Sequence, residues 1–157
     1  MSLVVRHPGG SRLSKMIDRP GGLSVGAAVA QARANLKSMQ ARSRVIVLER
    51  IAALGALAAA DPAAGGPARL AEAYRLSRDV IDAAGPFEQD DLCAVAAALC
   101  DRLDAPPGDR PFDWRIVSVH ARSMQLLLNL PPEAAEARRQ VLDSLRQVPV
   151  GRPPRAG

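Results

Sequence analysis

The stretch SVGAAVAQARANLKSMQARSRVIVLERIAALGALAAA, residues 24–60, decides the fold. It is rich in alanine and leucine, and it begins with a serine, a residue that favours helix N-caps. Its apolar residues recur every three or four positions, as on one face of an α-helix: Val25, Val29, Ala32, Leu36, Met39 and then, after Ser43, Val47, Ile51, Leu54 and Ala58. The stretch predicts a long helix over 24–60 whose buried face shifts near Ser43, with a break at Ser43 or Gly55 as the alternative.

The first half of this predicted helix is strongly basic. It carries Arg33, Lys37, Arg42 and Arg44, and no acidic residue accompanies them. An uncompensated row of cations on a helix is typical of a surface that faces solvent or a partner. We therefore expect a protruding or partner-facing segment that continues into a helix of the core.

The rest of the chain predicts four shorter helices, at about 67–84, 88–104, 114–129 and 132–148. Prolines and glycines separate them, and the apolar spacing within each is helical. The predicted buried faces are Leu70, Tyr74, Ser77, Ile81 and Ala84 in the first helix; Leu92, Ala96, Leu99 and Leu103, flanked by Cys93 and Cys100, in the second; Trp114, Val117, Ala121, Met124 and Leu128 in the third; Ala134, Val141, Leu145 and Val148 in the fourth. Aromatic residues make up only 3% of the chain, which also disfavours strands. The prediction is an all-α, up-and-down bundle of four core helices preceded by one long helix, within a domain spanning 23–148.

The two ends of the chain have the composition of flexible segments. Residues 1–22 contain two Pro-Gly-Gly sequences and are predicted to form a flexible basic arm, and residues 149–157 a disordered, proline-rich tail. Residues 1–50 hold nine basic and two acidic side chains, whereas residues 51–150 hold ten and fourteen. The sequence thus predicts a basic arm and helix attached to a mildly acidic bundle.

Cysteine spacing and hydropathy indicate a cytoplasmic protein. Cys93 and Cys100 lie seven residues apart in one predicted helix, so their Cα atoms are separated by roughly 10 Å, too far for a disulfide. The best apolar run, Ile51 to Ala60, is too short to span a bilayer, and no secretion signal is visible. We expect no membrane span, no cofactor and no metal site.

His120 is the one candidate for chemistry in the predicted core. It lies in the helix 114–129, inside a broad apolar sector that Ile116 and Leu127 extend. A histidine in the middle of a bundle helix is also the arrangement of histidine-phosphotransfer proteins, with Arg122 or an arginine of a neighbouring helix as a charge for the phosphate. However, Ser123 and Met124 stand where those proteins have a basic residue and a small one. A core histidine and a phosphoacceptor therefore both remain open.

Other chemistry finds little support in the sequence. No phosphate-binding loop, nucleophile elbow or dinucleotide fingerprint occurs, which argues against an enzyme. The basic N-terminal region could bind nucleic acid, but the bundle is acidic and aromatic side chains for base stacking are scarce. The same region would suit an acidic protein partner.

Three stretches carry a family resemblance: MIDRPGGLSVGAAVAQARANL (16–36), AEAYRLSRDVIDAAGPFEQDDLCAVAAALCDRLD (71–104) and FDWRIVSVHARSMQLLLN (112–129). In overall likeness the chain resembles the CheE family, which is encoded in bacterial chemotaxis gene clusters. The resemblance implies a role beside a histidine kinase, a receptor array and receiver proteins. It brings no assigned catalytic residue.

These observations favour a non-enzymatic adaptor or regulator in chemotaxis or two-component signalling. The predicted partner-binding residues are Arg6, Arg12, Lys15, Arg19, Arg33, Lys37, Arg42 and Arg44. The predicted partners are a receiver domain, a chemotaxis kinase or a receptor array, rather than a small molecule. A phosphotransfer protein using His120, a nucleic-acid-binding protein and a homodimer formed through the long helix are the alternatives.

Overall fold

A computed structural model describes residues 24–60, 66–105 and 111–147. These residues form five α-helices and no strand: α2 (Val25–Ala59), α3 (Gly66–Ala84), α4 (Asp90–Leu103), α5 (Arg115–Asn129) and α6 (Ala135–Arg146), with a 3₁₀ turn, η1 (Gly85–Phe87), after α3. The prediction of an all-α bundle is confirmed. The predicted arm 1–22 and tail 149–157 lie outside the described residues.

The chain divides into two compact units, residues 1–40 and residues 41–157. The division falls within α2. In the first unit the described residues, 24–40, are the N-terminal half of α2. Ser24 caps this helix, because its Oγ accepts a hydrogen bond from the backbone N–H of Ala27 at 3.2 Å.

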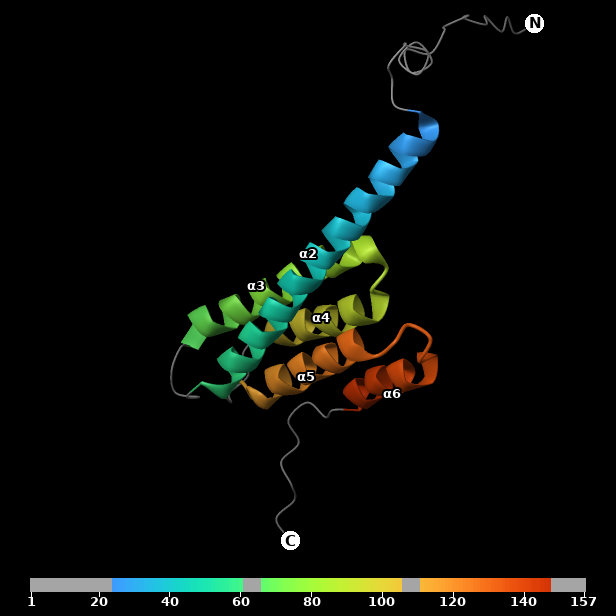
Figure 1. Cartoon of the computed structure of the whole chain (residues 1–157). Helices are drawn as coiled ribbons and strands as arrows, with labels where there is room; N and C mark the ends of the chain where they lie inside the picture. The colour runs from blue at the N-terminus through green and yellow to red at the C-terminus, as the bar shows by residue number, and fades with distance from the viewer. Residues whose placement is uncertain (1–23, 61–65, 106–110, 148–157) are drawn as a thin grey trace, which may run out of the picture. The chain divides into compact units, whose positions relative to one another are not determined.

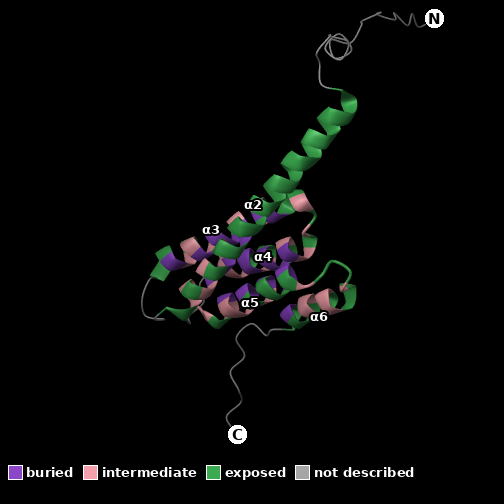
Figure 2. Cartoon of the chain, in the orientation of Figure 1, coloured by how far each residue is buried: buried purple, intermediate pink, exposed green. Residues whose placement is uncertain are grey.

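In the second unit, α3, α4, α5 and α6 form the up-and-down bundle. Each contacts the next, α6 also contacts α4, and the chain alternates in direction from one helix to the next (Figure 1). Their buried faces meet at the centre, while α6 contributes only one buried residue (Figure 2). The fully buried large side chains include Leu54, Val80, Leu92, Val95, Leu99, Val117, Met124 and Leu127.

The C-terminal half of α2 packs into this core through the predicted residues. Val47, Ile51 and Leu54 are 0%, 4% and 0% exposed. Polar contacts fix the same half: the Ser43 hydroxyl donates to the Ala83 carbonyl, and Arg50 pairs with Asp79 at 3.0 Å. The buried residues of α2 are Ser43, Val47, Ile51 and Leu54, and the helix is broken neither at Ser43 nor at Gly55.

Two helices begin later than predicted. α4 starts at Asp90 rather than 88, because Glu88 adopts a left-handed conformation with φ 57° at the end of η1. α6 starts at Ala135 rather than 132, because residues 131–134 form a turn closed by the Ala134 N–H and the Pro131 carbonyl at 3.1 Å. Val148, the last predicted core residue, lies outside the described residues.

The predicted buried face of α3 was confirmed at Ser77 and Ala84 and was wrong by about one residue at its other positions. The residues buried there are Arg69, Ala73, Leu76, Ser77, Val80 and Ala84, while Leu70, Tyr74 and Ile81 are only half-buried. α3 contains two rows of apolar residues, offset from each other by one position. Helical spacing alone does not show which of the two rows is buried. In the structure the row of small and aliphatic residues faces the core. The Tyr74 side chain stays partly in water, where its hydroxyl can form hydrogen bonds.

Candidate functional site

The N-terminal half of α2 presents an apolar strip to solvent. The strip consists of Val25, Val29, Ala32, Leu36 and Met39, and its four large members are 64%, 45%, 57% and 60% exposed. Every residue of 24–40 is exposed (Figure 2). On a helix these five positions fall within an arc of about 80°, so their side chains form one continuous surface.

The basic residues predicted to bind a partner divide into three groups. Arg6, Arg12, Lys15 and Arg19 lie outside the described residues. Arg33, Lys37 and Arg42 are exposed. Arg44 is exposed as well, but its Nη2 donates to the Leu128 carbonyl at 3.1 Å, near the C-terminal end of α5. Arg44 therefore contributes to packing of the bundle, as a cation at a helix C-terminus does.

His120 is a buried side chain of α5. Its residue is 4% exposed, and its Nδ1 lies 2.8 Å from the Ile116 carbonyl oxygen. A carbonyl can only accept, so Nδ1 carries the proton and Nε2 carries the lone pair. Burial lowers the pKa of His120 below its ordinary value, the hydrogen bond to Ile116 opposes this, and the positive charge of Arg102 adds to it. The ring is thus held neutral.

His120 also lines a pocket of about 190 Å³ between α4, α5 and α6. Apolar residues of α4 and α6 form most of its wall, and the other polar members are Arg102 and Arg146. Arg122, the residue predicted to assist a phosphate at His120, is exposed and is not part of this wall. The sequence allowed an arginine from a neighbouring helix beside His120, but it did not identify Arg102 and Arg146, because the rotation of those helices about their axes was unknown.

The burial of His120 bears on its chemistry. A receiver domain brings an aspartyl phosphate on a folded protein surface, and such a surface does not enter a pocket of this size. The pocket wall holds one group that titrates near neutral pH and no carboxylate or thiol. In the described residues no three metal-binding side chains cluster. Cys93 and Cys100 are free thiols, and burial raises the pKa of both.

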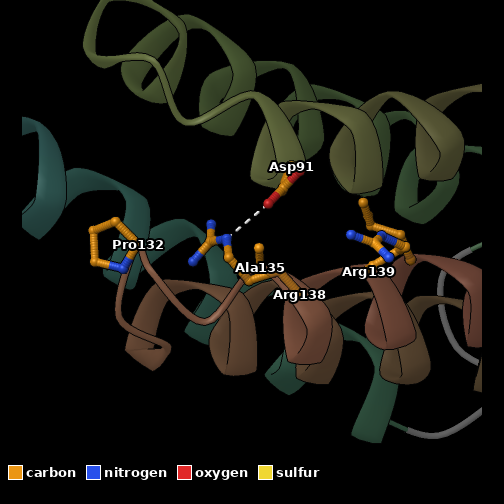
Figure 3. Close-up of a pocket in the computed structure, with 6 residues that line it drawn as sticks. Asp91, Pro132, Ala135, Arg138 and Arg139 are labelled. Carbon is orange, nitrogen blue, oxygen red and sulfur yellow. Dashed lines mark hydrogen bonds and ion pairs between the residues drawn. The ribbon is translucent and has the colours of Figure 1, made fainter.

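A second pocket, of about 370 Å³, lies at the N-terminal end of α4 beside α6 (Figure 3). Arg138 spans it: Nε contacts Asp91 at 2.7 Å, and Nη1 donates to the carbonyls of Leu127 and Leu130 at 3.1 and 3.2 Å. Arg139 pairs with Glu136 at 2.9 Å. Because the charged groups already satisfy one another, the arrangement ties α4, α5 and α6 together.

Arg69 is a buried charge that helical spacing alone does not distinguish from the other arginines. Its guanidinium donates to the carbonyls of Leu57 and Ala60, at the end of α2, and lies 3.7 Å from the centre of the Trp114 ring. A cation over an aromatic face and at a helix C-terminus is stabilised by both. Only the tertiary fold brings these three segments together, so spacing could not have revealed it.

Comparisons of the chain with models of protein families, with curated proteins and with solved structures found no match. Among the described residues, no helix has the length and apolar character needed to cross a membrane.

Proposed function

We propose that this protein is a non-enzymatic adaptor that binds an acidic protein partner through the N-terminal half of α2. The exposed apolar strip is the observation that supports the proposal. Four large apolar side chains on one helix face are costly to leave in water, and recognition of one amphipathic helix by another uses this i, i+3, i+4 spacing. The class of partner is a protein surface with an apolar groove and carboxylates along its rim.

Charge is the reason to favour an acidic partner over a second copy of the chain. Arg33 and Lys37 lie four residues apart at one edge of the strip, and residues 24–48 contain no acidic side chain. Pairing two copies of this segment would bring cations together with no carboxylate to compensate. A partner with acidic residues gains attraction at the same edge and associates faster.

The resemblance to the CheE family is the reason to propose chemotaxis signalling as the setting of the adaptor. Its candidate partners are a receiver domain and a chemotaxis histidine kinase. The buried His120 ring favours this contact-based role over phosphoryl transfer, which needs the ring to meet another protein.

The test is titration of the purified full chain with a purified receiver domain and with a purified chemotaxis kinase of the same organism, followed by calorimetry. Leu36→Glu should weaken binding at least about tenfold, because it places a charge in the strip. The matched control is Gln31→Glu, which makes the same charge change on the opposite side of the helix and should leave affinity within about twofold.

Three results would contradict the proposal. The first is equal loss in both variants, and the second is full affinity in Leu36→Glu. The third is a concentration-dependent dimer in sedimentation that Leu36→Glu abolishes, which would identify a second copy as the occupant.

A further inference from the structure

The charged side chains that line the pocket beside His120 are all cationic. Arg102 from α4 and Arg146 from α6 are its two charged members, and no carboxylate lines it. Asp143 pairs with Nη1 of Arg146 at 3.0 Å. A guanidinium has five N–H donors, so this pair leaves Arg146 further donors for a ligand. The remaining wall is apolar, including Val95, Leu142 and Leu145.

The Nε2 atom of His120 has unused hydrogen-bonding capacity. Nδ1 is satisfied by the Ile116 carbonyl, and within the described residues nothing bonds to Nε2. Nε2 is also not among the side-chain atoms that are sealed from solvent without a partner. His120 is 4% exposed and lines the pocket, which indicates that Nε2 faces the pocket. Because Nε2 carries a lone pair and no proton, it can accept a hydrogen bond but cannot donate one.

From these groups we infer that the pocket binds a small phosphate-type oxyanion that carries its own O–H, either inorganic hydrogen phosphate or the singly protonated form of a small phosphomonoester. The P–OH group donates to Nε2 of His120, and the anionic oxygens accept from Arg102 and Arg146. No covalent bond forms or breaks. The site is independent of the adaptor surface on α2, and its volume of about 190 Å³ admits a small ion though not a protein.

The two histidines of the chain make the test direct. The ring C–H resonances of His120 and His7 are followed by NMR while the full-length protein is titrated with inorganic phosphate near pH 6.5. His120 should shift along a saturable curve, and His7 serves as the internal reference. Arg102→Gln should weaken binding at least about tenfold, since it removes a charged donor. The matched control Arg122→Gln removes an exposed arginine two residues from His120 and should leave affinity within about twofold.

Further arms examine the role of the O–H group and the source of the phosphate. Sulfate, which lacks an O–H at this pH, should bind at least about tenfold more weakly than phosphate. Saturable binding of methyl phosphate that is tighter than that of inorganic phosphate assigns the site to a phosphomonoester, and the reverse assigns it to the free ion. A linear response of His120, equal weakening in both arginine variants, or sulfate binding as tight as phosphate would each overturn the proposal. Circular dichroism of Arg102→Gln verifies that the variant is folded.

Discussion

The two halves of α2 carry the same kind of apolar spacing, yet only the second half buries an apolar face. In residues 25–39 the large apolar side chains are between 45% and 64% exposed, while Val47, Ile51 and Leu54 are at most 4% exposed. The second half finds aliphatic partners and polar contacts in its own chain. Amphipathic spacing therefore identifies a face that will be covered, but not what covers it.

The contacts that distinguish the halves are specific. The second half has the Ser43 hydroxyl on the Ala83 carbonyl, the Arg44 guanidinium on the Leu128 carbonyl, and the ion pair of Arg50 with Asp79. The first half has the Ser24 cap and a hydrogen bond from Gln31 to Asn35, both local to the helix. Stability of the first half as a helix thus depends on local terms, which are marginal for a segment of this length.

The largest expected contrast is between two leucines of this helix. Leu54→Ala should lower the free energy of unfolding by about 2–5 kcal/mol, because it leaves a cavity in the core. Leu36→Ala should change it by about 0.5 kcal/mol or less, since Leu36 loses no buried contact and alanine favours helices. Urea unfolding measures both. A comparable loss in the two variants would show that the strip is part of the folded core, and the comparison would fail.

A second contrast concerns two arginines: Arg69 of α3, which contacts the C-terminal end of α2, and Arg33, which lies on the exposed N-terminal half of α2. Arg69→Lys should destabilise by about 1–3 kcal/mol, because an ammonium cannot reproduce the planar fork that reaches the Leu57 and Ala60 carbonyls over Trp114. Arg33→Lys, the same change on the exposed half, should stay within about 0.5 kcal/mol. Denaturation midpoints at unchanged m-value give both figures. If Arg69→Lys left the free energy of unfolding unchanged, the positive charge of Arg69 would be sufficient and its planar guanidinium would not be required.

Much of the fold followed from the sequence because it depends on short-range features. The helices 24–60 and 114–129 have long, regular apolar spacing, and both were predicted to within about a residue at each end. The α3 face was misplaced because two apolar rows compete there, and the start of α4 because a left-handed Glu88 precedes it. Rotation of a helix about its axis is decided by its neighbours, which spacing within one helix does not include.

The candidate sites differ in the same way: features within one helix were predicted, and features that join several helices were not. The apolar strip and its basic edge are properties of one helix, and the sequence analysis identified them. The His120 pocket joins α4, α5 and α6, so His120 was identified while Arg102 and Arg146 were not. Arg122, two residues from His120, was the nearest basic residue in sequence, but a step of two along a helix turns a side chain by about 200°.

The smallest effect concerns pH, because it involves a single imidazole in the packed unit, and residues 24–40 contain no histidine. Burial lowers the pKa of His120 in the folded protein, so the unfolded chain binds a proton more readily. This contribution is fully present above the ordinary histidine pKa of about 6.5 and is lost as pH falls from there toward the lowered folded value. Urea unfolding at pH 7.5, 6.5 and 5.5 should show stability decreasing in that order. In His120→Gln the decrease over this range should be smaller, because the group that titrates is gone. An unchanged slope in that variant would mean that the ring titrates alike in the folded and unfolded chain, and that its burial does not hold it neutral.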